Sequence, residues 1–410
     1  MTKTTTGPRL SKRAQELPAS ETLALAARAA ALKAEGKPVI SFSAGEPDFS
    51  SPGVVGEAAK AAIDAGDTHY PPVPGTAALR QAVVARTARE TGRKASVDQV
   101  LVSVGAKQVL FNLIHALVDP GDEVLYASPY WVSYPAMVQL AGGRGVPIPT
   151  RAETDFRLAP EDVEAAIGAR TKALILNSPS NPTGAVSSRE DIDAIVRLCL
   201  DKGVTVISDE IYGALVYGDA KHHSAYAVDD PRVPENVVLV DGVSKAYAMT
   251  GWRIGYAVGP VALIKAASKL QSQSTSGACS IAQAAAVAAL EKAGPEAERM
   301  RQAFARRCEL ATELLRQIPG VRVPRALGAF YLFPDFSAYR GSTIDGELIS
   351  DSTSLSNILI DRAHVAAVPG GAFGADDHLR FSYALGESEI REGLGRVKDL
   401  LARAVPQPGA

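Results

Sequence analysis

The sequence predicts an α/β protein with a large domain built on a mostly parallel central sheet, and a smaller α+β domain beside it. Through the middle of the chain, short apolar runs alternate with longer helix-like stretches. The apolar runs, such as ALIL at 173–176 and VTVIS at 204–208, lack polar alternation, which is typical of parallel strands covered on both faces. Beyond about residue 295 this rhythm ends, which indicates a second domain.

The elements of the large domain follow from these runs. The strand candidates are residues 100–104, 123–127, 173–177, 204–208, 237–241 and 254–258. The helix candidates are residues 107–117, 189–200 and 261–270. The alanine-rich run at 281–290 is too short to span a membrane and predicts a buried helix.

The smaller domain is predicted to be discontinuous in sequence. A long charged helix at 296–317 leads to three strand-like segments, AFYLFPD (329–335), HVAAVPGGAF (364–373) and HLRFSYA (378–384). An N-terminal helix at 22–35 and a short strand return to the same domain. We therefore expect a large domain at 51–295 and a small domain made of 1–50 and 296–410.

Composition excludes several classes of function. The formal net charge of -2 gives no electrostatic reason to expect nucleic acid or an anionic membrane as a partner. Three widely spaced cysteines without a CxxC pattern indicate free thiols in a reducing compartment, and no metal-ligand spacing occurs. The first 20 residues contain no apolar signal sequence, and no long apolar run occurs elsewhere, so we expect a cytoplasmic protein without membrane spans.

Reactive residues follow four of the predicted strands. Gly105, Ala106 and Lys107 follow the first strand, and Asn181 lies in a turn after the strand at 173–177. Asp209 and Tyr212 follow the next strand, and Ser244 with Lys245 follow the strand at 237–241. Because ligands of open parallel sheets bind beyond the carboxyl ends of the strands, these residues should converge on one crevice.

The residue types suit a cofactor that carries an aldehyde, a pyridine nitrogen and a phosphate. A lysine that loses its proton forms an imine with an aldehyde, and a carboxylate keeps a pyridine nitrogen protonated. Phenol and amide donors stabilise a ring oxygen, and backbone N–H groups at a helix start, together with an arginine, hold a phosphate. A nicotinamide site or a P-loop would need a GxGxxG or GxxxxGK[ST] pattern, and the chain has neither.

The segment SKAYAMTGWRIGY at 244–256 resembles the lysine-centred signature of class I aminotransferases, which belong to fold type I of the pyridoxal-phosphate enzymes. The resemblance extends over nearly the whole chain and is closest to the bacterial aspartate aminotransferases. Its other motifs, in family order, are AGEPDF (44–49), YPPVPG (70–75), VGAKQVLFNL (104–113), SPYWVSYP (128–135), NSPSNPTG (177–184), DEIY (209–212) and LRFSYA (379–384).

The resemblance implies a role for each residue around the cofactor. Lys245 forms the internal Schiff base with pyridoxal 5'-phosphate and then shuttles the substrate proton. Asp209 pairs with the pyridinium nitrogen, Tyr212 and Asn181 hydrogen-bond the ring oxygen, and Trp131 stacks on the ring. The residues implied at the phosphate are Gly105, Ala106, Lys107, Ser244, Arg253 and, from the neighbouring subunit of a homodimer with shared active sites, Tyr70.

The resemblance also implies how amino-acid and 2-oxo-acid substrates bind. Arg380 forks onto the α-carboxylate, with Gly45, Asn181 and Trp131 beside it. Lys107 meets the distal carboxylate of aspartate or glutamate, which favours aspartate:2-oxoglutarate transamination. The segment LPASET (17–22) departs from the KPSAT pattern common in the related bacterial aspartate aminotransferases, and Pro18 stands where that pattern has its lysine. Members of this group that also accept prephenate use residues in this segment, so activity on prephenate stays open.

Other interpretations remain at this stage. Taken alone, Lys245 would be a solvated side chain, Asp209 a helix cap and Arg380 a surface ion pair. An aminotransferase of aromatic, alanine or prephenate/glutamate specificity would keep the mechanism, and a carbon–sulfur lyase or aminocyclopropane-carboxylate synthase would share the cofactor. A cofactor-binding transcription regulator would need a DNA-binding domain before the fold. We interpret His222 and His223 as residues of a solvated loop.

Overall fold

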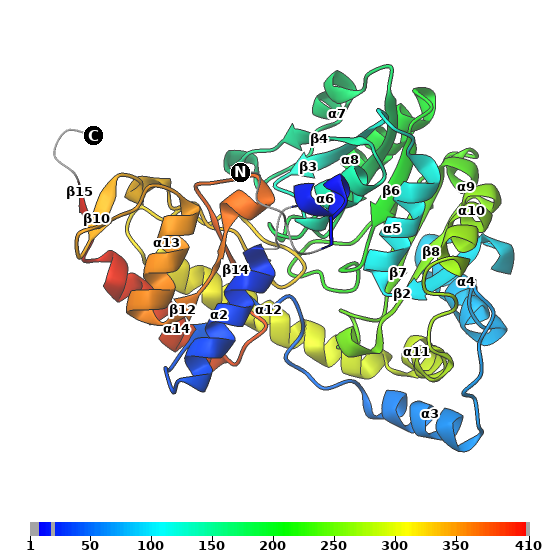
Figure 1. Ribbon diagram of the computed structural model, residues 1–410, viewed down its shortest axis with the longest axis horizontal. Helices are drawn as coiled ribbons and strands as arrows, with labels where there is room; N and C mark the ends of the chain where they lie inside the picture. Colours follow the sequence, from blue (N-terminus) through cyan, green and yellow to red (C-terminus); the bar gives the residue numbers. More distant parts are fainter. Residues whose placement is uncertain (1–7, 18–20, 407–410) are drawn as a thin grey trace.

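The computed structural model describes residues 8–17 and 21–406. A seven-stranded sheet with its helices forms one part of the molecule, and helices α2 (Glu21–Ala34), α13 (Ser352–Ile358) and α14 (Glu387–Leu401) lie in another (Figure 1). The long helix α12 (Gly294–Arg316) runs between the two parts. The α/β fold class with a mostly parallel sheet is confirmed.

The central sheet has the strand order β2-β8-β7-β6-β5-β3-β4. Its strands are β2 (Val100–Val104), β3 (Glu123–Ser128), β4 (Arg144–Pro149), β5 (Thr171–Asn177), β6 (Thr205–Asp209), β7 (Val237–Gly242) and β8 (Ile254–Val258). Five strands, from β7 to β4, pair in parallel, whereas β8 is antiparallel to both of its neighbours. The carboxyl ends of β2, β5, β6 and β7 therefore lie at one edge of the sheet, and β8 begins at that edge.

Both faces of the sheet are buried, as the continuous apolar runs predict. Along β5, Leu174 packs into one apolar layer, whereas Ala173 and Ile175 pack into the layer on the opposite face. Helices α5, α6 and α10 belong to the second layer. The helices of this part are α3 (Gly53–Asp64), α4 (Ala77–Thr91), α5 (Ala106–Leu117), α6 (Ser133–Leu140), α7 (Pro160–Ala166), α8 (Arg189–Asp201), α9 (Val233–Asn236), α10 (Val261–Ser272) and α11 (Ser280–Lys292).

A second apolar core joins α12 and α14 to short strands, with large aromatic side chains such as Phe304 and Phe330 at its centre. The strands of this part are β1 (Ile40–Ser41), β9 (Tyr331–Leu332), β10 (Ser342–Ile344), β11 (Glu347–Leu348), β12 (Val365–Ala366), β13 (Val368–Pro369), β14 (Leu379–Ser382) and β15 (Val405–Pro406). The short helix α1 (Lys12–Glu16) precedes them in the chain. Strand β1 pairs in parallel with β12, so the N-terminal segment returns to the C-terminal part of the chain as expected.

All six predicted strands of the large domain are present, with ends within two residues of prediction. Strand β4 was not predicted, because RGVPIP is mostly exposed, contains two prolines and lies at the sheet edge, where such residues are tolerated. In the parts of the chain that the structure describes, no helix has the length and apolarity needed to cross a membrane.

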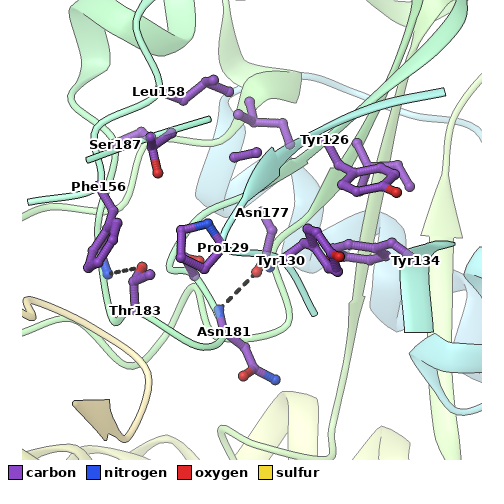
Figure 2. Close-up of a pocket in the computed structure, with 16 residues that line it drawn as sticks. Tyr126, Pro129, Tyr130, Tyr134, Phe156, Leu158, Asn177, Asn181, Thr183 and Ser187 are labelled. Carbon is purple, nitrogen blue, oxygen red and sulfur yellow. Dashed lines mark hydrogen bonds between the residues drawn. The ribbon is translucent and has the colours of Figure 1, made fainter. Parts of the chain in front are cut away.

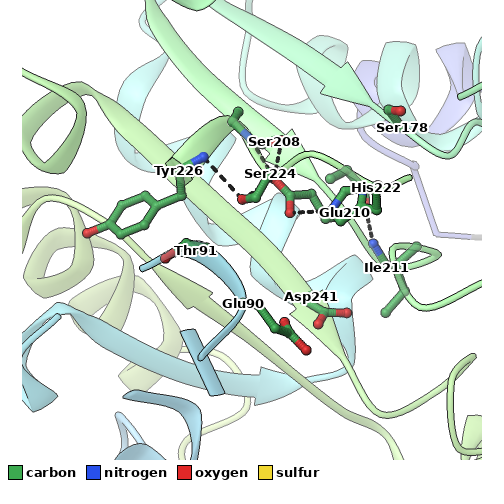
Figure 3. A network of polar contacts seen from close by, with 12 residues as sticks. Glu90, Thr91, Ser178, Ser208, Glu210, Ile211, His222, Ser224, Tyr226 and Asp241 are labelled. Atoms are coloured by element: carbon green, nitrogen blue, oxygen red, sulfur yellow. Dashed lines mark hydrogen bonds and ion pairs between the residues drawn. The ribbon is translucent and has the colours of Figure 1, made fainter. Parts of the chain in front are cut away.

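His222 and His223 lie in a loop as predicted, but the interpretation that their side chains are solvated was wrong. The Nε2 atom of His222 lies 2.8 Å from the carboxylate of Glu210, and that of His223 lies 2.9 Å from Asp193. Glu210 is buried directly after β6 and also accepts from Ser208 and Ser224 (Figure 3). A buried carboxylate needs such partners, and the local sequence does not identify them.

Candidate active site

The four predicted groups of reactive residues do converge at one edge of the central sheet. Asn177, at the end of β5, is in register with Asp209 at the end of β6, and Asp209 is in register with Val240 in β7. Strand β7 ends two residues after Val240, and the turn that follows the strand carries Lys245. The convergence expected from the ends of parallel strands is therefore present.

Lys245 places its amine at this edge of the sheet. Its Nζ atom donates to the carbonyl oxygen of Gly45 at 2.5 Å and lies 5.8 Å from the ring centre of Tyr212. Burial lowers the pKa of Lys245 to about 8, and the nearby cations Arg380 and Arg253 act in the same direction. A substantial fraction of the amine is consequently neutral near physiological pH, which is the form that attacks an aldehyde.

Asp209 is a buried carboxylate with two local hydrogen bonds. The hydroxyl of Tyr134 donates to its Oδ2 atom at 2.7 Å, and the N–H of Ile211 donates to Oδ1 at 3.4 Å. Burial raises the pKa of Asp209 to about 6, although both hydrogen bonds oppose that shift. The carboxylate is thus costly to ionise without a nearby cation, and a protonated ring nitrogen is such a cation.

Arg380 is 3% exposed and lies in β14, on the opposite part of the molecule from the central sheet. Its guanidinium donates to the side-chain oxygen of Asn181 at 3.0 Å and to the carbonyl of Ser43 at 3.1 Å. It lies 4.5 Å from the ring centre of Tyr331, which favours a cation. No carboxylate within the described residues forms an ion pair with it, so its charge is available to an anionic ligand.

The backbone of Asn181 is fixed by a hydrogen bond to a side chain at the end of β5. Its N–H donates to the side-chain oxygen of Asn177 at 3.0 Å (Figure 2). The cavity behind it, lined by Tyr126, Tyr130 and Tyr134 among others, has a volume of only about 30 Å³. That volume holds one or two waters rather than a cofactor, and the side-chain oxygen of Asn181 accepts from Arg380.

The start of α5 forms an anion cradle beside Arg253. Gly105, with φ of +83°, precedes the helix, and a Cβ atom there would lie 2.6 Å from the Arg253 guanidinium. A Cβ atom at Gly255 would lie 2.1 Å from the backbone nitrogen of Ala106. These two glycines let Arg253 and the N–H groups of Ala106 and Lys107 approach each other, an arrangement that suits a phosphate.

Aromatic side chains cover the cradle and the lysine. The Nζ atom of Lys107 lies 5.0 Å from the ring centre of Trp131, at the mouth of the site. The hydroxyl of Tyr212 lies 3.0 Å from that of Tyr331, and burial raises the pKa of Tyr212 well above its ordinary value. Both phenols are therefore neutral and able to donate hydrogen bonds.

Ser244 and Tyr70 differ in their surroundings. Ser244 is buried immediately before Lys245. Tyr70 is 96% exposed, a high value for so large an aromatic side chain. Within the described residues no hydrogen bond joins Tyr70 to this site, so the single chain does not bring it to Lys245.

The comparison with known proteins decides the family. Residues 37–397 match the family model described as aminotransferase class I and II. The chain is 44% identical to an aspartate aminotransferase of Streptomyces avermitilis over 97% of both chains, and 43% identical to a probable aspartate/prephenate aminotransferase of Aquifex aeolicus over 96% of this chain and 98% of the relative. The chain belongs to the class I and II aminotransferases.

Solved structures agree with this assignment. The aspartate aminotransferase of Rhizobium meliloti has a TM-score of 0.93 and 41% identity over 97% of this chain and 100% of its own. The maleate complex of the Thermus thermophilus aspartate aminotransferase has a TM-score of 0.90 and 42% identity over 96% of this chain and 100% of its own. The predicted family and its fold type are confirmed, and this protein is a pyridoxal-phosphate-dependent enzyme that transfers amino groups between amino acids and 2-oxo acids.

The residues of this aminotransferase fit pyridoxal phosphate. The cradle at Gly105 has room only for backbone and the Arg253 side chain, which leaves N–H donors open to a phosphate. The amine of Lys245 and the buried carboxylate of Asp209 reach the same sheet edge. The Nε atom of Arg380 is buried without a hydrogen-bond partner among the described residues, as expected of a group that completes its contacts on a ligand.

Sequence reasoning missed two residues of the aminotransferase site. Tyr134 contacts Asp209 directly, and Tyr331 contacts both Tyr212 and Arg380. Tyr134 lies within the SPYWVSYP motif, three residues after Trp131, so the motif contained a signal. Tyr331 lies in a short buried apolar segment whose pattern predicts only a strand.

Proposed function

We propose that this aminotransferase exchanges amino groups between aspartate and 2-oxoglutarate. The observation that carries the proposal is the set of three cationic groups at one site, Lys245, Arg380 and Lys107, of which Lys245 has a pKa of about 8. Two separated cations beside a reactive amine suit a dicarboxylic amino acid. The names of relatives that cover almost the whole chain support the same substrate.

Lys245 is the proposed catalytic residue. When bound, pyridoxal phosphate supplies an electron sink that stabilises negative charge at the α-carbon of the amino acid. Lys245 would hold the cofactor covalently until substrate replaces it, and its neutral Nζ would then accept and return the α-proton. The carbonyl of Gly45, 2.5 Å from Nζ, orients the amine toward the site.

The remaining proposed roles concern cofactor binding. Asp209 would pair with the ring nitrogen, Asn181 and Tyr212 would donate to the ring oxygen, and Trp131 would cover one face of the ring. Burial of Asp209 and Tyr212 supports these roles because it makes their hydrogen bonds strong and their positions fixed. The phosphate would be held by Gly105, Ala106, Lys107, Ser244 and Arg253.

For the substrate, Arg380 would bind the α-carboxylate through its fork, with Gly45, Asn181 and Trp131 beside it. The free Nε of Arg380 supports this role. Lys107 would bind the distal carboxylate. Burial lowers the pKa of Lys107, and the nearby Arg253 acts in the same direction, so an anion at this position would relieve repulsion between two cations.

We also propose a homodimer with shared active sites. Tyr70 is exposed, and an apolar groove of about 840 Å³, lined by Phe49, Trp252 and Ile281 among others, opens beside Arg253. A two-fold partner would cover this groove and bring its own Tyr70 toward the phosphate cradle. In each chain, residues 51–295 would form the large domain, and 1–50 with 296–410 the small one.

A panel of half-reactions, each monitored through the absorbance of the bound cofactor, tests the proposal. Aspartate, glutamate, alanine, phenylalanine and a prephenate-derived amino acid would each be mixed with the cofactor-loaded enzyme. Fastest conversion with aspartate, restored by 2-oxoglutarate, is the expected result. A preference for alanine or phenylalanine would overturn the aspartate assignment, and turnover of the prephenate partner would add that substrate. Pro18, at which the sequence departs from the KPSAT pattern, lies outside the described residues.

A further inference from the structure

Arg86 lies in α4, away from the reactive edge of the sheet, and its guanidinium uses all of its nitrogens. The residue is 6% exposed. Nη1 donates to the hydroxyl of Tyr247 at 2.7 Å, and Nη2 lies 3.2 Å from the carboxylate of Asp241. Nε lies 3.1 Å from Glu90, one turn further along α4. A planar fork of this kind holds its partners in a fixed geometry that a lysine cannot reproduce.

Two of these partners bracket Lys245 in the sequence. Asp241 lies in β7, four residues before the lysine, and Tyr247 lies two residues after it. Both side chains are buried, at 7% and 6% exposure. Arg86 therefore contacts the chain on both sides of the residue that the proposed function makes catalytic.

The backbone alone holds this turn weakly. The N–H of Ala248 donates to the carbonyl of Lys245 at 3.4 Å, and the N–H of Met249 donates to that of Ser244 at 3.2 Å. Both distances lie at or beyond the long end of the ordinary range. Ala248 has φ of +50°, so the turn does not continue as a helix. Its position must be set largely by side chains.

Further hydrogen bonds hold the Asp241 carboxylate in place. The hydroxyl of Tyr256 donates to Asp241 at 2.9 Å, and the N–H of Gly242 donates to the other oxygen of the same carboxylate at 2.7 Å. The side chains of Asp241 and Glu90 lie near each other (Figure 3), and Arg86 forms an ion pair with each of them. Burial raises the pKa of Asp241, and Arg86 opposes that shift, so the guanidinium favours the ionised carboxylate that receives these bonds.

We propose that Arg86 is a positioning residue for Lys245: its guanidinium clamps Asp241 and Tyr247 together and thereby fixes the turn that carries the reactive amine. The inference rests on the proposed role of Lys245. It does not depend on which amino acid the enzyme prefers.

The clamp has a consequence at the amine itself. Loss of the Tyr247 contact leaves the hydrogen bond from the Ser51 hydroxyl to the Ala248 carbonyl, at 2.9 Å, as a remaining side-chain contact at that end of the turn, so the turn is loosened and Nζ would spend less time against the carbonyl of Gly45. Displacing a reacting group by about 1 Å lowers rates by roughly 100-fold, and partial loosening should cost on the order of 10-fold in kcat. The KM for amino acid should change less, because the groups that bind the substrate carboxylates lie on other elements.

The experiment compares Tyr247→Phe with Glu90→Gln in the cofactor-loaded enzyme. Each variant alters one partner of the same guanidinium, but only Tyr247 lies on the lysine turn, and the amide of Glu90→Gln still accepts from Nε. The readouts are kcat and KM in half-reactions, the pH midpoint of the cofactor absorbance change, which reports the basicity of the Lys245 linkage, and urea denaturation. If Arg86→Gln folds, it should show the larger effect, because it removes every contact of the guanidinium. If it does not fold, Tyr247→Phe alone tests the proposal.

The expected result is a lower kcat and a shifted absorbance midpoint for Tyr247→Phe, with kcat within about twofold of the parent and the midpoint within about 0.3 pH unit of it for Glu90→Gln. Parent values of both quantities in a folded Tyr247→Phe enzyme would overturn the clamp. Equal shifts in the two variants would also overturn it, because they would reflect a general loss of stability. Failure of the proposed role of Lys245 is detected separately, by turnover that survives Lys245→Ala.

Discussion

Asp209→Asn should make the cofactor-free protein more stable while it removes activity. Asp209 is 3% exposed and its pKa is raised to about 6, chiefly by burial. An acid whose folded pKa lies above its unfolded value contributes stability below the unfolded pKa, and that contribution is lost as pH rises through the folded pKa. For Asp209 the loss occurs between about pH 4 and pH 6.

The magnitude follows from the size of the shift. The ordinary value is 3.8 and the folded value is about 6, so the difference is about 2 pH units. At 1.36 kcal/mol per unit, the ionised side chain destabilises the cofactor-free protein by about 3 kcal/mol above pH 7. Asparagine keeps the shape, but its single side-chain oxygen can accept from Tyr134 or from Ile211 and not from both, so the variant should gain that free energy less the cost of one hydrogen bond, about 1 kcal/mol.

The assay is urea denaturation of both cofactor-free proteins at one protein concentration, at pH 4, 5, 6 and 8. The difference in free energy of unfolding should shift in favour of the variant by about 2–3 kcal/mol between pH 4 and pH 8, because the lost hydrogen bond contributes equally at every pH. The contributions of the other carboxylates to the pH dependence cancel in this difference, because both proteins carry them. A difference that does not change with pH would refute the reasoning, since it would show that ionisation of Asp209 is not the source.

Three further outcomes are expected. Lys245→Ala should lose nearly all transamination while it still binds the cofactor through the non-covalent contacts of Arg253 and Asp209, and parent-level turnover would contradict its role. Lys107→Ala should weaken aspartate and glutamate relative to alanine by about 1–3 kcal/mol in kcat/KM, the scale of a charge-assisted contact; an equal loss for every substrate would assign Lys107 to the phosphate alone. Mixed Tyr70→Asp and Lys245→Ala chains should recover roughly a quarter of parental activity after subunit exchange, because half of the dimers are hybrid and each hybrid has one intact site. No recovery after verified exchange would rule out sharing of Tyr70 between subunits.

Much of the site could be predicted because its residues follow strands that the local pattern identifies. The runs that become β5, β6 and β7 are continuous and apolar, so their ends are clear, and Asn181, Asp209 and Lys245 come directly after them. Parallel strands share one edge for their carboxyl ends, which brings these residues together without further information. Strand β4 escaped prediction because an exposed edge strand does not require an apolar run.

Other contacts were beyond local pattern. Strand β8 reads like its neighbours in sequence, and only its antiparallel pairing with β2 and β7 places Arg253 at the reactive edge beside Gly105. His222 looked solvated because its neighbours in the chain are polar, yet its partner is a buried carboxylate from a different segment.

The sequence by itself determined the fold class and the family and pointed to Lys245 as the candidate reactive lysine, because each depends on residue types in order along the chain. Only the tertiary structure decided that Tyr134 bonds Asp209 and that Arg86 spans the lysine turn. Those partners lie 75 and about 160 residues apart. Such contacts depend on strand order, register and helix packing, and a side chain that is polar and buried carries no local mark of the partner that will satisfy it.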